Sequence, residues 1–292
     1  LTAQPLGERA RIRGLQSHHR SVERVGPGNR VAVNLTGISH SELRRGDVLV
    51  NSEQWHTTAM IDAGLTVLPS LGHDVSRRGA FAAYIGSGEF NAKVRVLGPD
   101  TLSPGSDGAV RLYLKRSVPV LPGDRFILRE HGRDETVGGG EILDIEPVVR
   151  ASRAAPDRTI ERVIRERGWV TAAELERLTG EVVAPTLGEW VTTPEAVVAT
   201  LESVLERVTD AGATGVDLAA FDDRERAAID TTEELVVDAG LVLPADAVDP
   251  YVDHPFLAEL LDGGFTPPSA DDVDRNDMRE LARRGHIVQR DG

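Results

Sequence analysis

The feature that most constrains this fold is a change of hydrophobic period near residue 150. Before it, short apolar runs alternate with polar residues and are separated by Gly and Pro turns. Strands at that spacing are typical of barrels or sandwiches rather than of a sheet with crossover helices. After residue 157 the apolar residues recur at helical spacing. The sequence therefore predicts an all-β first half and a mainly α-helical second half.

The elements expected from these patterns can be stated as ranges. The predicted strands are 10–15, 30–35, 47–50, 57–63, 80–85, 92–97, 108–114, 125–130 and 140–145. The predicted helices are 158–167, 172–178, 194–210, 224–230 and 255–261. Between the two sets, residues 146–157 (EPVVRASRAAPD) are predicted to be a linker.

The second half also carries a degenerate repeat. Its long helices end at Gly168, Gly212 and Gly264, which are 44 and 52 residues apart, and a short second segment follows each glycine. Helix, turn, helix and then an apolar strand pair, as in LVVDAGLVLP and GHIVQRDG, describes a winged helix. The expected domains are a partial β-barrel (1–50), a β-barrel (51–150) and three winged helices (151–193, 194–250 and 251–292), the last truncated in its wing.

Composition excludes several classes of protein. There is no cysteine, so thiolate nucleophiles, thiolate metal sites and disulfides are ruled out. No run of about 18 apolar residues and no signal-peptide pattern occurs, so we expect a cytoplasmic protein with no membrane partner. Residues 1–150 hold 19 basic and 17 acidic side chains, whereas residues 151–292 hold 14 and 30. That acidity argues against indiscriminate coating of nucleic acid.

Three stretches resemble one family. Residues 10–50 (ARIRGLQSHHRSVERVGPGNRVAVNLTGISHSELRRGDVLV) resemble the second, β-barrel domain of elongation factor Tu-like translational GTPases, and most closely the selenocysteine-specific factors of the SelB family. Residues 114–147 (LKRSVPVLPGDRFILREHGRDETVGGGEILDIEP) are similar to the end of the third domain, also a barrel. Residues 254–288 are similar to the winged-helix tail of actinobacterial-type members.

The resemblance implies a role in translation. A SelB-like factor binds selenocysteinyl-tRNA through its barrels, reaches an mRNA hairpin through its last winged helices and works on the ribosome. We expect a monomer. The family's GTPase domain and the first strands of its second domain are missing here, and no G-x-x-x-x-G-K-[ST] phosphate loop occurs. This chain is therefore not expected to be an enzyme or to hold a cofactor; GTP and Mg²⁺ belong to the family's missing domain.

Arg45, in LRRGDVLV, is the candidate for the aminoacyl pocket. The resemblance places an arginine of this loop near the selenocysteinyl end of the tRNA, and a permanent cation suits an anionic selenolate. The competing interpretation is an exposed arginine in an ordinary turn.

Arg77, Arg78 and Arg116 are candidates for contacts with tRNA phosphates, since the family's third domain grips the tRNA backbone and phosphate contacts need only well-placed cations. Arg95, Arg111 and Arg133 are scattered through the same domain. Each could instead be a solvated surface side chain.

An arginine stripe near the end of the chain is the candidate for RNA binding. Arg275, Arg279 and Arg283 fall at i, i+4 and i+8, with Arg284 beside them and Arg290 in the expected wing. The stripe could contact RNA phosphates or an unpaired base. Neighbouring acidic residues could instead pair with it; they are Asp271, Asp272, Asp274, Asp277 and Glu280.

Two further interpretations complete the set. TVGGGEIL (136–143) leads into a strand, so close strand packing is favoured over a phosphate cradle. No metal site is predicted, because adjacent histidines such as His18 and His19 point to opposite faces of a strand. The alternative function is a winged-helix DNA-binding transcriptional regulator with a β-barrel sensing domain, which the acidic tail disfavours. The winged helices could also be spacers.

Overall fold

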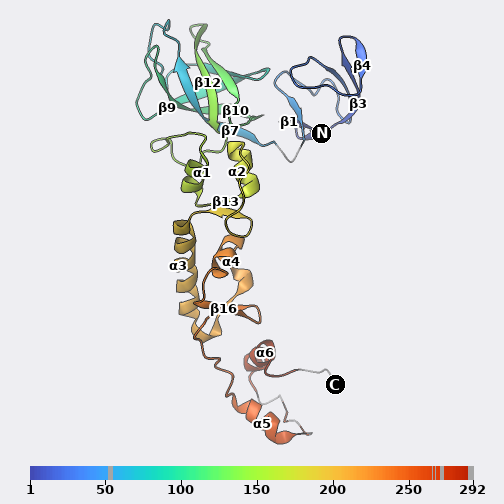
Figure 1. The fold of residues 1–292 in the computed structure, drawn as a ribbon, viewed down its shortest axis with the longest axis vertical. Coiled ribbons are helices and arrows are strands. Elements are labelled where there is room, and N and C mark those ends of the chain that lie inside the picture. The colour runs from blue at the N-terminus through green and yellow to red at the C-terminus, as the bar shows by residue number, and fades with distance from the viewer. Residues whose placement is uncertain (52–54, 265, 267, 270–272, 289–292) are drawn as a thin grey trace. The chain divides into compact units, whose positions relative to one another are not determined.

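The computed structural model describes residues 1–51, 55–264, 266, 268–269 and 273–288. The chain divides into two compact units, residues 1–184 and residues 185–292, which are considered separately (Figure 1). The first unit holds the predicted β half and two helices beyond it. The second holds the remaining helical part.

Residues 1–50 form two small antiparallel sheets. One has the order β2-β1-β6 and the other β4-β3-β5. Their strands are β1 (Thr2–Gln4), β2 (Glu8–Arg9), β3 (Arg11–Ser17), β4 (Arg20–Val22), β5 (Ala32–Thr36) and β6 (Val48–Val50). The three predicted strands correspond to β3, β5 and β6. The remaining strands β1, β2 and β4, of two or three residues each, were not predicted. Most of β3 is exposed, so this sheet buries little apolar surface.

Residues 57–144 form the closed barrel expected of the first half. Its strand order is β10-β7-β12-β11-β8-β9. The strands are β7 (Thr57–Val67), β8 (Phe81–Ile85), β9 (Gly88–Leu97), β10 (Asp107–Pro119), β11 (Arg125–Glu130) and β12 (Glu135–Asp144). Buried and exposed residues alternate along β9, as a strand with one face in a core requires. Ile61, Leu112 and Leu128 are fully buried and fill the interior.

The three glycines of β12 serve strand packing, as predicted. A Cβ atom on Gly140 would overlap the carbonyl oxygen of Gly64 on β7, and one on Gly138 would overlap that of Thr66. Only glycine allows β7 and β12 to approach this closely. The prediction that these glycines do not cradle a phosphate is consistent with this packing.

The segment after the barrel differs from the linker that the sequence predicts. Arg111 of β10 donates to the carbonyl of Val149 (2.9 Å), and Arg162 donates both to the carbonyl of Asp157 (2.9 Å) and to Asp144 at the end of β12 (2.8 Å). Ala151 is buried. These contacts fasten residues 146–157 to the barrel, and the first compact unit runs on to residue 184 instead of ending near 150.

Two helices complete the first unit. They are α1 (Ile160–Arg167) and α2 (Ala172–Thr179), with β13 (Trp169–Thr171) between them. Thr159 and Thr171 cap the helix N-termini through their side-chain oxygens. Gly168 and Gly180 follow the helices with positive φ angles of 74° and 81°. The two helices were predicted from their apolar periodicity and Gly168 from its place after the first helix, whereas the capping threonines were not predicted.

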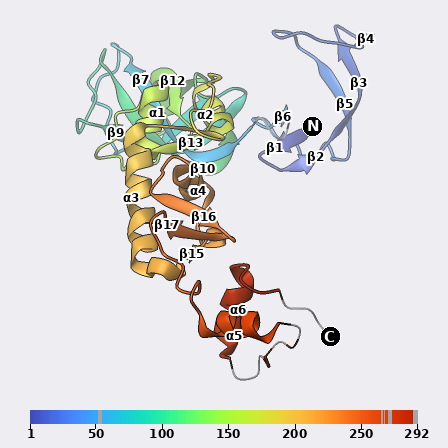
Figure 2. The same ribbon diagram turned by 60° about the horizontal axis from the view of Figure 1, so that its bottom comes forward.

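The second unit contains a winged-helix arrangement. Helix α3 (Pro194–Ala211) lies beside the sheet β15-β17-β16 (Figure 2). The remaining elements are β14 (Trp190–Thr192), η1 (Gly212–Thr214), β15 (Val216–Asp217), η2 (Leu218–Ala220), α4 (Asp223–Ile229), β16 (Leu235–Asp238) and β17 (Leu241–Pro244). Its core consists of Val204, Val208, Phe221, Ile229, Leu235 and Val242.

Two short helices follow, α5 (Pro255–Gly263) and α6 (Arg275–Arg283). Phe256 and Leu281 are their buried residues. The predicted wing is not a strand over residues 286–288, and its remainder lies outside the described residues. Among the helices that the structure describes, none is long and apolar enough to cross a bilayer.

Candidate nucleic-acid interface

Three arginines line an open depression on the barrel side of the first unit. Arg77 and Arg78 come from the loop between β7 and β8, and Arg95 comes from β9; all three are exposed. The depression has a volume of about 650 Å³, and Ser152 of the segment after the barrel also lines it. Within the part of the chain that the structure describes, none of these three arginines forms an ion pair. Their charges are therefore available to an anion.

The loop that carries Arg77 and Arg78 is held on both sides by backbone hydrogen bonds, at Val75 and at Ala80, whose carbonyl accepts from the N–H of His131 (2.8 Å). Val75 is buried and forms a two-way backbone bridge with Leu102, at 2.8 and 2.9 Å. The Ser76 hydroxyl accepts from the backbone N–H of Arg78 (3.2 Å). The two guanidinium groups thus project from a fixed backbone.

Arg45 lies in the loop before β6 and is exposed. Its Nε donates to the carbonyl of Ser87 (2.7 Å), in the turn between β8 and β9. The neighbouring Gly46 donates its N–H to the Ser87 hydroxyl (3.2 Å). Arg45 therefore helps to join residues 1–50 to the barrel. Its terminal guanidinium nitrogens take no part in that bond and remain able to hold an anion.

Arg116 occupies a different environment from Arg77 and Arg78. Its guanidinium lies 4.9 Å from the centre of the Phe90 ring and 3.7 Å from the Asp47 carboxylate. The expectation of a free phosphate contact does not fit this position, because the guanidinium already contacts the Phe90 ring and the Asp47 carboxylate. Arg45 and Arg116 both form side-chain contacts that join residues 1–50 to the barrel.

The arginine stripe on α6 divides into two classes. Arg275 and Arg279 are exposed, and the described residues provide no ion-pair partner for either. Arg283 lies 3.6 Å from Glu280 and 3.7 Å from Asp217. Partial pairing with acidic neighbours therefore occurs, as the competing interpretation of the sequence expected. Arg290 lies outside the described residues.

Arg284 is a correction to the predicted stripe. Its side chain is only 5% exposed, and it pairs with Asp249 (3.0 Å) and Glu280 (3.2 Å). It also donates to the carbonyl of Ala213 and lies over the Tyr251 ring. A guanidinium buried among two carboxylates is not free for RNA, so we assign Arg284 to holding α6 in place. Asp249 lies 35 positions away, and no periodicity in the sequence indicates that contact.

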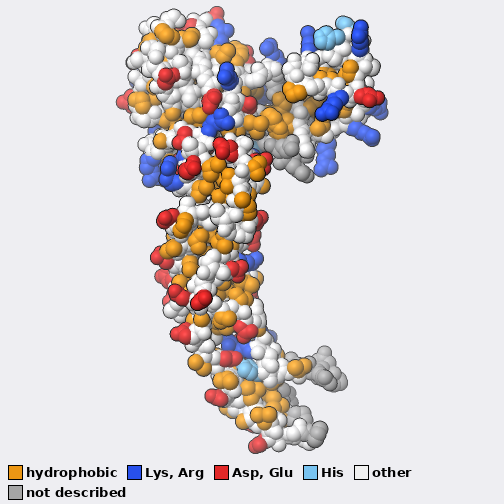
Figure 3. Space-filling view, in the orientation of Figure 1, with side chains coloured by type: hydrophobic (Ala, Val, Ile, Leu, Met, Phe, Trp, Pro, Cys, Tyr) orange, Lys and Arg blue, Asp and Glu red, His pale blue; other side chains and the backbone are white. Residues whose placement is uncertain are grey.

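Charge is distributed unequally between the units. In the view of Figure 3, Lys and Arg side chains gather around the sheet of β3, β4 and β5, while Asp and Glu side chains spread over α3. Residues 1–50 hold eight arginines and four acidic residues. The basic surface of the first unit is thus that of residues 1–50, and the second unit offers only local basic spots.

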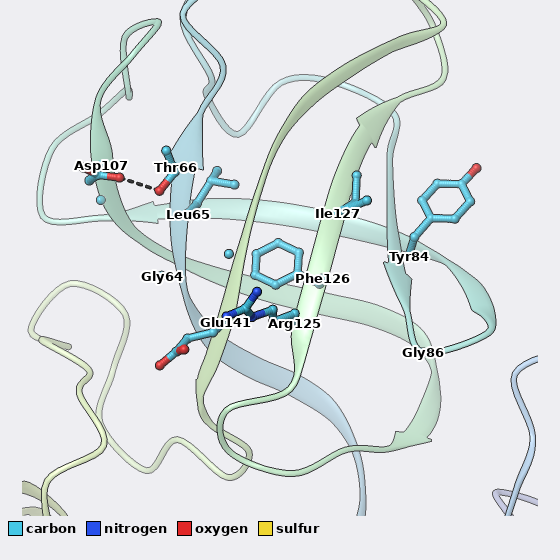
Figure 4. Close-up of a pocket in the computed structure, with 12 residues that line it drawn as sticks. Gly64, Leu65, Thr66, Tyr84, Gly86, Asp107, Arg125, Phe126, Ile127 and Glu141 are labelled. Carbon is cyan, nitrogen blue, oxygen red and sulfur yellow. Dashed lines mark hydrogen bonds between the residues drawn. The ribbon is translucent and has the colours of Figure 1, made fainter. Parts of the chain in front are cut away.

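A groove of about 820 Å³ lies across β7, β11 and β12 (Figure 4). Gly64 and Gly140 leave the strands bare there. At one end Thr66 donates to Asp107 (2.5 Å), and Tyr84 points away from the other labelled side chains. Arg125 and Glu141 lie apart from the Thr66–Asp107 pair. The groove offers no converging set of polar groups for chemistry.

The sequence of the barrel is similar to that of known elongation factors. Residues 65–148 match the family model for the β-barrel domain of the selenocysteine-specific elongation factor SelB. The selenocysteine-specific elongation factor of Desulfomicrobium baculatum is 32% identical over 189 residues, which cover 60% of this chain and 30% of that protein. Elongation factor 1-alpha of Ignicoccus hospitalis is 26% identical over 165 residues, covering 49% of this chain and 36% of that protein.

A solved structure matches most of the fold. The crystal structure of a bacterial selenocysteine-specific elongation factor, EF-Sec, aligns with a TM-score of 0.67 and 16% identity, covering 89% of this chain and 47% of that one. At that identity the likeness concerns the fold alone. The chain spans about a third of the length of the curated relatives described above. The predicted family is confirmed for the barrel, residues 65–148, and the predicted order, a β half before a helical half, is confirmed for the fold.

Proposed function

Residues 65–148 belong to the β-barrel domain family of the selenocysteine-specific elongation factors, and from that premise we propose that this chain serves selenocysteine incorporation during translation. Its task would be to hold selenocysteinyl-tRNA on the barrel and to connect it, through the helical part, with an mRNA hairpin at the ribosome. The observation that carries the proposal is the coincidence of this family barrel with three exposed arginines around one depression, none of which forms an ion pair with a residue that the structure describes.

The arginines of the depression would contact the tRNA backbone. Arg77, Arg78 and Arg95 are exposed, and Arg77 and Arg78 stand on an anchored loop. Phosphate contacts fix a protein's position on RNA without reading its sequence. Such contacts would bind any tRNA of the right shape, so discrimination of the amino acid must come from elsewhere.

Arg45 is the candidate for that discrimination. Its Nε is held by Ser87, which leaves the terminal nitrogens to meet a selenolate. Residues 1–50 form two open sheets and Arg45 is exposed, so little of the described chain would surround an amino acid held there. We therefore expect weak discrimination between selenocysteinyl-tRNA and seryl-tRNA.

Contact with the mRNA hairpin would fall to α6. Arg275 and Arg279 are the two arginines of the predicted stripe that remain exposed and unpaired among the described residues. GTP hydrolysis by the factor would belong to a segment outside this sequence, since no phosphate-loop motif occurs in it.

The test is binding of this chain to selenocysteinyl-tRNA, with seryl-tRNA on the same tRNA body as the comparison, over a series of salt concentrations. Replacing Arg77 and Arg78 together by alanine should weaken binding to both tRNAs. It should also reduce the slope of log K against log salt by about one for each phosphate that the variant no longer neutralises. Arg125→Ala removes an exposed arginine elsewhere on the barrel and serves as the control.

Two results would count against the proposal. One is equal affinity of the Arg77/Arg78 variant and the parent chain. The other is a folded parent chain that binds neither tRNA at low salt, which would redirect attention to DNA or protein partners.

A further inference from the structure

A histidine and two glutamates converge beside the loop that carries Arg77 and Arg78. His73 lies in that loop, Glu130 ends β11 and Glu135 begins β12. One ligand atom from each side chain lies within 4.8 Å of the other two. The distances from His73 Nε2 are 2.7 Å to Glu135 and 3.7 Å to Glu130. Among the residues that the structure describes, this is the one such group of three potential ligands.

The two glutamates stand directly opposite each other in the β11–β12 hairpin. Like charges in facing positions of an antiparallel pair destabilise it unless a cation lies between them. The Glu130 side chain is only 10% exposed, so water screens its charge poorly. A cation between Glu130 and Glu135 would therefore stabilise the hairpin.

The basic side chains near the two glutamates compensate their repulsion only in part. Arg133 lies 3.8 Å from Glu130 and 4.0 Å from Glu135, and its side chain is 53% exposed. At those distances it forms no hydrogen bond, and it can swing into solvent. His73 is the nearer group, with its Nε2 only 2.7 Å from the Glu135 carboxylate.

The second ring nitrogen of His73 is also engaged. Nδ1 lies 3.1 Å from the carbonyl oxygen of Asp74 and must donate its hydrogen there, because a carbonyl can only accept. A neutral ring then directs the lone pair of Nε2 at two carboxylates, which is repulsive. Either a proton or a metal ion must lie between Nε2 and the glutamates. A histidine whose other N–H is fixed by a backbone carbonyl is the usual arrangement of a metal ligand.

We propose that His73, Glu130 and Glu135 form a binding site for a divalent transition-metal ion, with Zn²⁺ as the best-fitting candidate. One imidazole nitrogen and two carboxylate oxygens suit Zn²⁺ better than Mg²⁺, which takes oxygen ligands. Two ligands at the usual Zn²⁺ distances in a tetrahedral site stand about 3.3 Å apart. The separations of 2.7 and 3.7 Å lie on either side of that value, so small side-chain rotations would seat the ion.

The site would tie three segments of the barrel together. The ion would bridge the β7–β8 loop to both strands of the β11–β12 hairpin, and Arg133 would move outward as the metal replaces it. Because His73 precedes Arg77 and Arg78 in the same loop, occupancy would also hold the segment from which those arginines project. The metal site itself does not depend on the tRNA proposal.

Calorimetric titration of Zn²⁺ into the metal-free full chain tests the site, with Mg²⁺ titrated in parallel. His73→Gln and Glu135→Gln should each weaken the tightest Zn²⁺ binding by at least about tenfold. His286→Gln is the matched control. His286 lies 2.6 Å from the Asp249 carboxylate, as close as His73 lies to Glu135, but it belongs to no group of three potential ligands among the described residues. The control substitution should leave the tightest Zn²⁺ binding unchanged.

Thermal unfolding supplies an independent measurement. Zn²⁺ should raise the Tm of the parent chain and of the His286 variant but not of the other two. Metal-free melting curves show whether each variant is folded. The Glu135 side chain is one-third exposed, so Glu135→Gln tests the loss of a ligand separately from any structural effect of changing His73. Equal Zn²⁺ affinity in all four proteins, or no saturable uptake by the parent, would overturn the proposal and leave an imidazolium ion pair.

Discussion

Two aspartate–arginine pairs show how differently the two units use charge. Asp62 and Arg111 join neighbouring strands of the barrel, 49 residues apart, through two hydrogen bonds of 2.6 and 2.8 Å. Both side chains are less than 5% exposed. Asp222 and Arg224, in the second unit, are two residues apart, 2.8 Å from each other and about half exposed. One pair links distant strands and the other closes a local turn.

The pKa values of the two aspartates move in opposite directions. Burial raises the pKa of Asp62, although the hydrogen bond and charge of Arg111 act against it. The hydrogen bond from Arg224, followed by the backbone N–H of Glu225, lowers the pKa of Asp222. The ionised carboxylate is thus costly to bury in the barrel and favoured on the helix. Environment, more than the identity of the partner, sets what an ion pair contributes.

The largest expected effect comes from breaking the buried pair on one side. Arg111→Met leaves the Asp62 carboxylate buried without its partner and removes the hydrogen bond to Val149. We expect a loss of about 3–5 kcal/mol in the free energy of unfolding of the barrel. Denaturant unfolding followed by circular dichroism in the β-sheet region measures it.

The double variant Asp62→Leu/Arg111→Met is its control. Replacing both charges by apolar side chains of similar size should restore most of the loss, since neither charge then needs to be desolvated. If the single and double variants were equally unstable, the volume of the side chains and not the unpaired charge would be responsible.

The contrast also marks the limit of prediction from sequence. Alternating patterns and turn residues predicted the barrel strands, and the packing role of Gly138 and Gly140 followed from their position in a strand. The end of the first helix followed from Gly168, because a helix stop depends on neighbouring residues only, whereas the helix begins after the Thr159 cap, two residues later than predicted. The contacts that failed to be predicted join residues far apart in sequence, where strand register and folding decide which side chains meet.

The candidate sites illustrate the same limit. The helical spacing of Arg275 and Arg279 was visible in the sequence, but not that Asp249 draws Arg284 inward. His73 and Glu135 are 62 residues apart, and neither stands in a recognisable metal motif. The one advance signal was the hairpin itself, since two glutamates around a four-residue turn face each other across the strands.

An intermediate effect is expected on α6, where paired and unpaired arginines share one helix. Arg279→Ala removes an exposed charge with no ion-pair partner among the described residues, whereas Arg283→Ala removes one already within 4 Å of Glu280 and Asp217. Removing one phosphate interaction should weaken RNA binding about fivefold near physiological salt and reduce the salt slope by about one. A fluorescein-labelled RNA stem-loop, titrated at several salt concentrations, measures both quantities.

Arg283→Ala is the matched control, because it changes the charge of the same helix by the same amount. Its effect should be smaller than that of Arg279→Ala. Equal losses in the two variants would mean that RNA senses only the overall charge of the unit and that pairing within α6 is irrelevant to binding.

The smallest effect should come from the exposed pair. Asp222 caps α4, where its side chain accepts from the backbone N–H groups of Arg224 and Glu225. Asp222→Ala should cost the second unit roughly 0.5–1 kcal/mol, seen as faster hydrogen exchange over α4. Asp223→Ala, next to it and exposed, removes an ion pair with Arg226 (3.3 Å) but no cap, and should accelerate exchange less than Asp222→Ala.

This small effect has a defined dependence on pH. Because the pKa of Asp222 in the folded chain lies below its unfolded value of 3.8, the stabilisation from its charge is complete above that value and is lost as pH falls through the folded pKa. The difference between the parent and Asp222→Ala in the free energy of opening, derived from hydrogen exchange, should therefore be constant from about pH 5 to 8 and shrink below about pH 4. A difference that persisted in acid would assign the cap to the neutral carboxyl group, and the contrast with Asp62 would then rest on burial alone.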